Sequence, residues 1–195
     1  MYKQAIRSGS VILFLAMLAA TSRAADDGRV LFDFSKPDAA KAWVNVNDGV
    51  MGGISDGRFK ITDDKTMEFY GTLSLENNGG FASVRSRPTK VNLKAGDSVV
   101  ARVRGDGREY SFNLYVTRDA GRYSFRQTFE TKKGEWIEIS LPLSKFAATR
   151  RGRMFPDQKL DPSKVNSVGF LLGDKKAGPF KLEVDWIKIQ NGVEE

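Results

Sequence analysis

The sequence predicts an all-β domain built as a sandwich of two antiparallel sheets. Short runs rich in β-branched and aromatic residues recur along most of the chain. Gly, Asp, Asn and Pro separate these runs at short intervals, which is typical of sandwiches and barrels. Two of the runs, 109–117 and 122–129, alternate in the way that places successive side chains on opposite faces of a strand.

Residues 1–24 are expected to be a secretory signal peptide outside this domain. Basic residues precede the apolar run 11–20, VILFLAMLAA, and a small-x-small end closes at Ala24. The run is too short for a bilayer-spanning helix, which needs about 20 residues, so no stable membrane insertion is expected. A mitochondrial transit peptide is the alternative, although such peptides are amphipathic. We expect residues 25–195 to form one domain in the periplasm or outside the cell.

The first part of the domain contains five expected strands. Each is bounded by turn residues and is rich in residues that favour strands. They are 30–34 (VLFDF), 42–46 (AWVNV), 58–62 (RFKIT), 67–75 (MEFYGTLSL) and 81–86 (FASVRS).

The connection 47–57, NDGVMGGISDG, is dense in Gly, the residue that loses most conformational freedom on folding. Its NDG start is a turn signal, and its Gly-Gly pair permits a positive φ or a close backbone approach. Met51 is expected to fill a gap at the end of the core. Two interpretations stay open: a loop that crosses the mouth of the sandwich, or a binding loop with Asp48 and Ser55 as polar contacts.

The second part of the domain contains six more expected strands. They are 97–105, 109–117, 122–129, 135–143, 165–173 and 180–189. One helical turn is expected within 142–146. Residues 147–164 lack a strand pattern and are expected to be a long loop, which is uncommon in a compact domain and often functional. Three arginines in this loop, 150, 151 and 153, belong either to a solvated loop or to a contact for an acidic partner or lipid head groups.

Alternation predicts a polar sheet surface. In 109–117, Tyr110 and the residues in phase with it are expected to face the core, whereas Asn113 and Tyr115 face the other side. Arg126 of the next run and Trp136 are expected to join them on this surface. Trp186, by contrast, is expected to lie in the core.

Residues 104–110, RGDGREY, are expected to form a hairpin centred on Asp106 and the Gly that follows it. A tight turn explains the RGD tripeptide, which is too short a pattern to indicate integrin binding. Arg104 and Arg108 either clamp a carboxylate or phosphate of a ligand or pair with acids of the chain itself.

The sequence contains no His and no Cys. A Ser-His-Asp triad and a Cys-His pair are therefore excluded, and a conventional zinc site lacks its ligands. Paired carboxylates of the glycoside hydrolase kind remain as the enzymatic alternative, but we expect a protein that is not an enzyme. No cofactor is expected, apart from a structural calcium held by some of four acids: Asp48, Asp56, Asp63 and Asp64.

The formal net charge is +7, and part of it would leave with the signal peptide. Such an excess serves solubility, so nucleic acid is not an expected partner.

Several motifs occur together in one order along the chain. They are W-x-x-x-N-D-G-V-M-G-G-x-S at 43–55, G-G-F-A-S-V-R at 79–85, R-G-D-G-R-x-Y at 104–110, Trp136, R-G-R at 151–153 and G-P-F-x-L-E-x-D-W-I at 178–187. This set resembles the CIA30 family, the complex I intermediate-associated protein 30 domain and its bacterial relatives, over about residues 30–190.

The resemblance implies a galactose-binding-domain-like jelly roll and kinship to carbohydrate-binding modules of the same shape. For mitochondrial members it implies a non-catalytic, chaperone-like role in the assembly of respiratory complex I. The expected export signal departs from this pattern, so the resemblance transfers the fold better than the assembly role.

Two functional hypotheses follow. The first is a protein-binding or assembly factor, whose site would combine polar turns at one rim: Asp48, Met51, Ser55, Arg85, Arg104, Asp106, Arg108 and Tyr110. The second is a carbohydrate-binding module that uses a sheet face: Asn113, Tyr115, Arg126 and Trp136.

Overall fold

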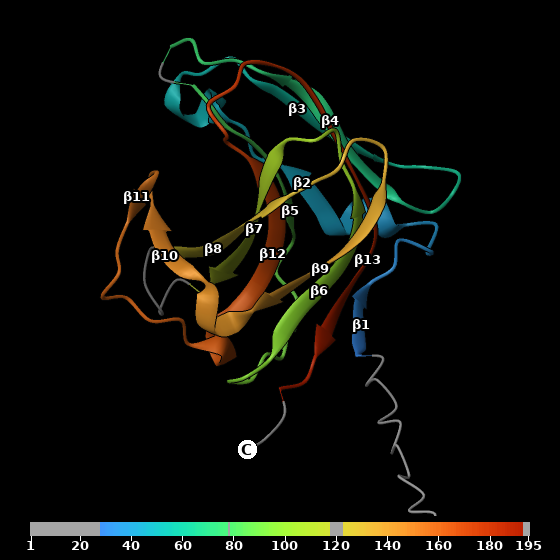
Figure 1. Ribbon diagram of the computed structural model, residues 1–195, viewed down its shortest axis with the longest axis vertical. Helices are drawn as coiled ribbons and strands as arrows, with labels where there is room; N and C mark the ends of the chain where they lie inside the picture. The colour runs from blue at the N-terminus through green and yellow to red at the C-terminus, as the bar shows by residue number, and fades with distance from the viewer. Residues whose placement is uncertain (1–27, 78, 118–122, 193–195) are drawn as a thin grey trace, which may run out of the picture.

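The computed structural model describes residues 28–77, 79–117 and 123–192, which form two antiparallel sheets packed face to face (Figure 1). The predicted all-β sandwich is confirmed. The expected signal peptide lies outside the described residues. Among those that are described, no helix is long and apolar enough to cross a membrane.

In the described residues, one sheet has six strands in the order β3-β4-β13-β6-β9, with β1 also paired to β13. Its strands are β1 (Arg29–Phe32), β3 (Asp56–Ile61), β4 (Met67–Leu73), β6 (Ser98–Arg104), β9 (Trp136–Pro142) and β13 (Gly178–Gln190). The long strand β13 pairs with β6 on one side, and with β4 and then β1 on the other.

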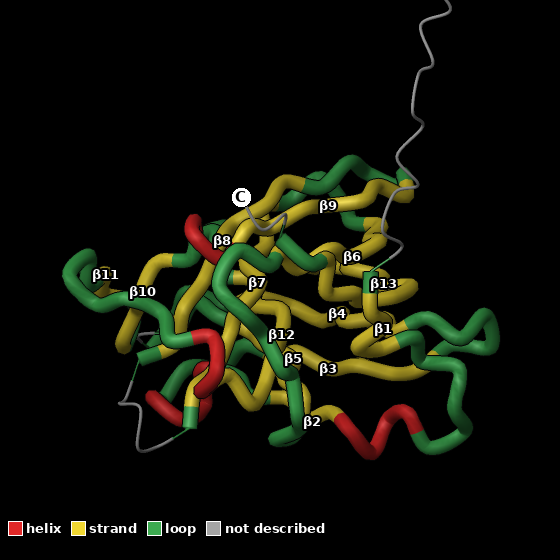
Figure 2. Tube along the Cα trace, turned by 90° about the horizontal axis from the view of Figure 1, so that it is seen from below, coloured by secondary structure: helices red, strands yellow, loops and turns green. Residues whose placement is uncertain are grey.

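The other sheet has seven described strands in the order β11-β10-β8-β7-β12-β5-β2. They are β2 (Trp43–Asn45), β5 (Ala82–Ser86), β7 (Glu109–Val116), β8 (Ser124–Glu130), β10 (Ala147–Arg150), β11 (Arg153–Met154) and β12 (Val165–Leu172). Short 3-10 turns lie in the connections (Figure 2): η1 (Ala39–Ala42), η2 (Asp48–Met51), η4 (Leu143–Lys145) and η5 (Pro162–Lys164).

Each strand predicted from the sequence is present, with ends shifted by up to about two residues, and η4 is the expected turn within 142–146. The expected long loop 147–164 is partly wrong, because it begins with the hairpin β10–β11. Strand β10 pairs with β8, where Ala148 lies opposite Phe125. Four residues followed by two are too short for alternation to be recognised, which is why the hairpin was missed.

The core lies between the sheets. Of the residues predicted to face it, Tyr110, Phe112 and Leu114 are fully buried, whereas Val116 is half-buried at its edge. Phe112 and Phe170 pack edge to face at 5.1 Å between ring centroids. Burying such side chains contributes roughly 1.5–3 kcal/mol each, so the packed inner faces fix which face of each strand is left to solvent.

Trp186 does not lie in the core as expected. The register of β13 against β6 shifts between Val184 and Trp186, so the buried side chains are Val184 before this irregularity and Ile187 after it. Trp186 is half-buried, with the Lys188 amine 4.7 Å from its ring centroid. An extra residue in one strand reverses the phase of the alternation, and the sequence pattern does not reveal it.

Residues 104–110 do not form a hairpin, since β6 and β7 belong to different sheets. The segment carries the chain from one sheet to the other. Gly107 has a φ of +90°, a conformation that side chains rarely adopt. A crossing and a hairpin therefore share the same local Asp-Gly signal.

Candidate functional site

A pocket of about 460 Å³ lies on the solvent face of the seven-stranded sheet. We call it the sheet pocket. Its floor comes from neighbouring strands, because Asn113 lies opposite Arg126 and Tyr115 lies opposite Ser124. Ser124 lies opposite Thr149 of β10 in turn. The structure therefore brings Asn113, Tyr115 and Arg126 together on one face, as expected from alternation.

Arg85 and Tyr115 form the centre of this floor. The Arg85 guanidinium carbon lies 4.5 Å from the Tyr115 ring centroid, which is a cation–π contact. The Tyr115 hydroxyl accepts a hydrogen bond of 3.0 Å from Asn113 Nδ2. Burial raises the pKa of Tyr115, so the phenol is neutral at physiological pH. The cation covers one face of the ring, and that face is not open to a stacking ligand.

Gly169 makes this arrangement possible. It lies on β12 opposite both Arg85 and Asn113. A Cβ at Gly169 would lie 2.3 Å from the Val84 carbonyl oxygen and 3.3 Å from Arg85 Cγ. A side chain there would push β5 away and occupy the space that the Arg85 side chain needs.

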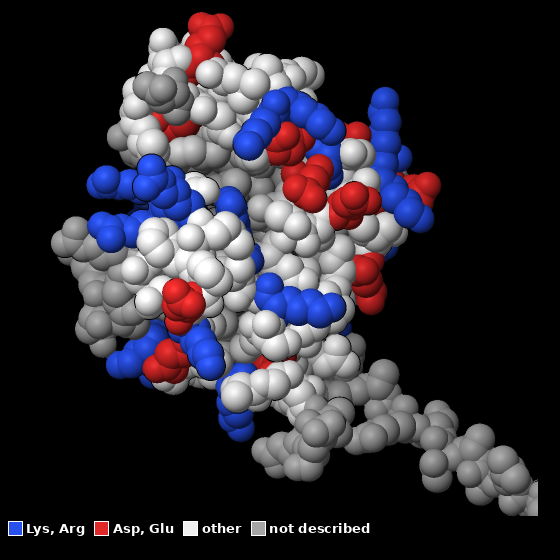
Figure 3. Space-filling model, turned by 60° about the vertical axis from the view of Figure 1, so that its left-hand side comes forward, with Lys and Arg blue, Asp and Glu red and all other residues white. Residues whose placement is uncertain are grey.

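The rest of the pocket lining contains both basic and apolar side chains. Besides Arg85, the cations are Arg126, Arg151 and Lys175. The apolar lining residues are Met51, Leu75, Phe81 and Leu171. On the side of the molecule that carries β10 and β11, basic side chains gather beside uncharged surface (Figure 3).

Acidic side chains do not line the described pocket. Within the described ranges, no three Asp, Glu, His or Cys residues gather in one group. A glycoside hydrolase needs two carboxyl groups facing the substrate, and the sheet pocket does not supply them. Of the acids suggested for calcium, Asp56 instead pairs with Arg58 at 2.8 Å.

Asp48 and Ser55 are buried, and they brace the loop rather than offer contacts to a ligand. The Asp48 carboxylate is fully buried. It accepts hydrogen bonds from Ser55 N at 2.9 Å, Ser55 Oγ at 2.5 Å, Gly80 N at 2.8 Å and Phe81 N at 3.3 Å. Burial acts to raise the Asp48 pKa, but these bonds outweigh it and the pKa is lowered. In the structure these two side chains therefore support the loop 47–57 from inside, which is the arrangement that the loop-mouth interpretation expects.

The same carboxylate explains the glycines around it. A Cβ at Gly53 would lie 2.4 Å from Asp48 Cγ, and one at Gly79 would lie 2.7 Å from Asp48 Oδ2. Met51 does not fill the core end as expected, because the buried carboxylate occupies the inside of the loop. Its side chain is 53% exposed and lines the sheet pocket.

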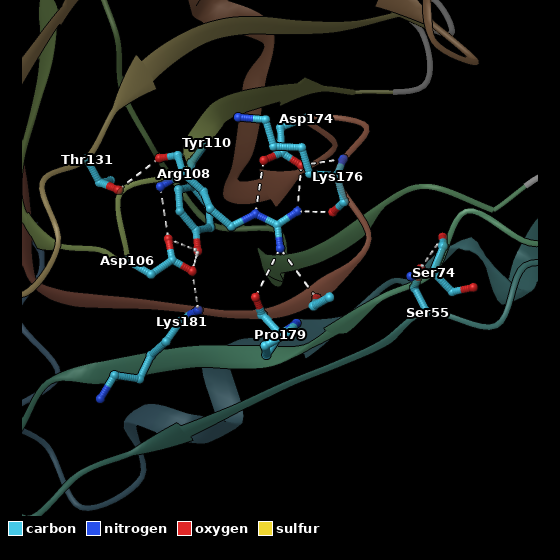
Figure 4. Close-up of polar contacts among 11 residues, drawn as sticks. Ser55, Ser74, Asp106, Arg108, Tyr110, Thr131, Asp174, Lys176, Pro179 and Lys181 are labelled. Carbon is cyan, nitrogen blue, oxygen red and sulfur yellow. Dashed lines mark hydrogen bonds and ion pairs between the residues drawn. The ribbon is translucent and has the colours of Figure 1, made fainter.

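Arg108, Asp106 and Tyr110 form a second brace (Figure 4). Arg108 donates from Nε and Nη2 to both Asp174 oxygens at 2.9 and 2.6 Å. It also donates to the carbonyl oxygens of Pro179, at 3.0 Å, and of Lys176. The hydrogen bond and charge of Asp174 raise the Arg108 pKa. Although burial opposes ionisation, hydrogen bonds from Arg108 and the Lys176 amide lower the Asp174 pKa.

Asp106 completes this brace. It accepts a 2.9 Å bond from the Lys181 amide and 3.2 Å contacts from the Tyr110 hydroxyl. Burial raises the pKa of Tyr110, and the Asp106 carboxylate raises it further. The three residues expected in the ligand site therefore tie the two sheets together.

Arg104 and Trp136 lie on the six-stranded sheet, away from the pocket. Arg104 pairs with Glu183 at 2.5 Å, and the guanidinium carbons of Arg102 and Arg104 each lie 4.7 Å from the Trp136 ring centroid. Trp136 therefore does not join Asn113 and Tyr115 as expected. Alternation assigned its face within β9 correctly, but it does not say to which sheet β9 belongs.

Sequence reasoning missed several pocket residues. Arg151 belongs to the basic segment noted in the sequence. It lies in the turn between β10 and β11 and has a left-handed φ of +49°. The pocket residues Lys175 and Leu75, and Gly169 beneath Arg85, carried no recognisable signal, because their importance depends on which strands become neighbours.

Comparison with known proteins places this fold and sequence in context. The family model for complex I intermediate-associated protein 30 matches residues 32–184. The mitochondrial complex I intermediate-associated protein 30 of Mus musculus is 29% identical over 186 residues, covering 84% of this chain and 56% of that protein. The Drosophila melanogaster protein is 27% identical over 187 residues, covering 83% and 62%. The chain thus spans between half and two thirds of these relatives.

Solved structures show the same sandwich. A family 11 carbohydrate-binding module from Clostridium thermocellum, in complex with a β-1,3-1,4-mixed-linked tetrasaccharide, matches with a TM-score of 0.64 and 19% identity. The match covers 86% of this chain and 97% of that one. An exo-β-agarase matches with a TM-score of 0.56 and 12% identity, over 86% of this chain and 26% of the enzyme. At these identities the likeness establishes the jelly-roll fold alone.

Proposed function

Because this chain belongs to the complex I intermediate-associated protein 30 family, we propose that it is a non-catalytic binding protein of the assembly-factor type that holds a partner protein on the sheet pocket. The curated relatives are named for association with an intermediate of complex I. The chain contains no His or Cys, and the described pocket lining contains no acid. Binding, rather than conversion of a substrate, is the activity that this lining supports.

The observation that carries the proposal is the mixed lining of the pocket. Cations from Arg85, Arg126 and Arg151 lie beside the exposed side chain of Met51. Arg, Met and aromatic residues are enriched where proteins bind one another. Arg85 and Arg126 lie on strands of one sheet, and Met51 lies on the loop that the buried Asp48 carboxylate holds, so little backbone ordering would be needed there on binding.

The compartment is part of this proposal. Residues 1–24 act as an export signal, and residues 25–195 act as one domain in the periplasm or outside the cell. The partner is then an envelope or exported protein.

Affinity capture with residues 25–195 tests the proposed function. The wild-type domain is expected to retain a reproducible protein from envelope extract, and the Arg126→Ala/Arg151→Ala variant is expected to lose it. Trp136→Ala on the other sheet serves as the control and should retain the same protein. The proposal is contradicted if the pocket variant retains the same protein as the wild type, or if the wild type retains no reproducible protein.

Carbohydrate binding is the second candidate. It is favoured by Asn113, Tyr115 and Arg126 lying together on an open sheet face. The pocket volume of about 460 Å³ falls within the roughly 300–1,000 Å³ of small-ligand sites. A glycan array supports this candidate if a glycan binds the wild type and Trp136→Ala but not Tyr115→Ala. An array without a glycan above background removes it.

A further inference from the structure

Three cations of the sheet pocket have no ion-pair partner among the described residues. In the part of the chain that the structure describes, Arg126, Arg151 and Lys175 take part in none of the ion pairs. Several half-buried cations elsewhere are paired with an acid: Arg104 with Glu183 and Arg108 with Asp174. Like charges gathered around one hollow repel each other. Their placement is favourable when an external anion lies between them.

The same pocket also has an exposed apolar lining. Met51 and Leu75 are 53% and 47% exposed, and both line the pocket. They belong to loops that are held in place, because the buried Asp48 carboxylate binds the amides of Ser55 and Gly80. Large apolar side chains exposed together beside a hollow indicate an interaction site.

A third feature is an acceptor without a donor. The Asn113 side chain is almost fully buried, and its Oδ1 has no hydrogen-bond partner among the described residues. Its amide nitrogen is already used by Tyr115. A buried acceptor left unpaired is unfavourable, so a ligand that brings an N–H or O–H donor to this floor would relieve that cost.

We propose that the sheet pocket binds an extended peptide segment of the partner protein in which apolar side chains adjoin Asp or Glu. The carboxylates lie among Arg126, Arg151 and Lys175, and the apolar side chains pack against Met51 and Leu75. A backbone N–H of the segment supplies the missing donor. This inference rests on the proposed function and specifies the partner's chemistry.

An anionic oligosaccharide fits the same charges less well. Sugars are held largely by stacking on open aromatic faces, and the Tyr115 face is covered by Arg85 at 4.5 Å. Met51 and Leu75 would also remain exposed beside a ligand made of hydroxyls and carboxylates. The apolar lining therefore decides in favour of a peptide.

Fluorescence anisotropy with short synthetic peptides tests the inference. The probe is a fluorescein-labelled peptide that alternates leucine with aspartate or glutamate. One control peptide has serine for leucine, another has lysine for the acids, and an oligogalacturonate is used as an unlabelled competitor. We expect the acidic leucine peptide to bind, and both control peptides to bind at least about tenfold more weakly.

Two pocket variants and a matched control complete the design. Arg126→Ala/Arg151→Ala and Met51→Ser should each weaken binding of the probe several-fold. Lys132→Ala changes a 70% exposed cation outside the pocket lining and should leave binding unchanged. Unaltered thermal unfolding shows that the variants fold.

The outcomes separate this inference from the proposed function. Equal binding of the leucine and serine peptides, or binding of oligogalacturonate alone, overturns the peptide inference. If the probe does not bind but affinity capture still depends on Arg126 and Arg151, the inference fails and the proposed function stands. If neither the probe nor any captured protein depends on the pocket, both fail.

Discussion

The guanidinium of Arg85 lies 4.5 Å from the ring centroid of Tyr115, although the strand that carries Gly169 separates the two residues in the sheet. Gly169 has no side chain, so Arg85 can lie across β12 onto β7. Tyr115 belongs to the surface expected for sugar binding, but one face of its ring contacts the Arg85 cation instead. This contact also links the fold to the charge of the sheet pocket.

Removing the Tyr115 hydroxyl tests this support. Tyr115→Phe retains the ring beneath Arg85 but leaves the Asn113 amide without its acceptor. We expect a loss of about 1–2 kcal/mol in the free energy of unfolding, because a buried donor is left unpaired. Urea unfolding measures this loss. No change would mean that the hydrogen bond does not contribute to stability.

Gly169→Ala should destabilise the protein by about 1–3 kcal/mol, since the added Cβ would lie 2.3 Å from the Val84 carbonyl oxygen. Gly49→Ala is a matched control, because a Cβ there meets no atom within 4 Å. Thermal unfolding of both variants checks the prediction. Equal melting temperatures would contradict the close approach of β5 and β12.

Asp48→Asn should cost about 2–4 kcal/mol at neutral pH, because an amide places a donor against the donors of Ser55 and Gly80. Asp63→Asn, at an exposed position, should change stability little. Chemical unfolding at pH 7 compares the two variants, and similar losses would contradict the buried brace.

The Asp48 effect should depend on pH in one direction. The folded-state pKa is lowered below the unfolded value, so ionisation of Asp48 stabilises the fold above pH about 4. This contribution disappears as the pH falls through the folded-state pKa. The stability gap between wild type and Asp48→Asn should therefore narrow in acid, and a gap that widens there would be inconsistent with a lowered pKa.

Arg108 should matter far more for stability than an exposed arginine. The side chains of Arg108 and Asp174 are 13% and 4% exposed. Arg108→Ala therefore leaves the buried Asp174 carboxylate without its partner and should lower the free energy of unfolding by about 3–5 kcal/mol. Arg108→Lys should recover only part of this stability, since an ammonium lacks the planar pair of N–H donors that a guanidinium offers to a carboxylate. Arg58→Ala breaks an exposed pair and should change stability little, because solvent screens such a pair. Comparable losses at Arg58 and Arg108 in urea unfolding would refute the buried brace.

Local pattern was sufficient to predict the described strands other than β10 and β11, and the faces of β7 and β8. Alternation depends only on backbone geometry, so Asn113, Tyr115 and Arg126 were correctly expected on one surface. Membership of a sheet is not a local property, and for this reason Trp136 was assigned to the wrong surface. The Asp-Gly signal at 106–107 was equally unable to distinguish a hairpin from a crossing between sheets.

Long-range partners account for the other differences. Arg108 meets Asp174 across 66 residues, and Asp48 meets Gly80 across 32 residues. A sequence pattern indicates that such charged residues need an ion-pair or hydrogen-bond partner, but it does not identify that partner. Arg108 and Asp48, which were expected to contact a ligand, are therefore paired inside the fold. Arg126 and Arg151 take part in no ion pair among the described residues.

Site-specific photo-crosslinking in the cells that produce the protein tests the central claim most directly. A photoreactive phenylalanine analogue replaces Arg151, at the exposed rim of the sheet pocket, or Glu138, which is exposed on the other sheet. We expect position 151 to form a discrete crosslink to another protein and position 138 to form none. Crosslinks from position 138 alone, or identical patterns from both positions, would contradict the assignment of the sheet pocket as the binding surface.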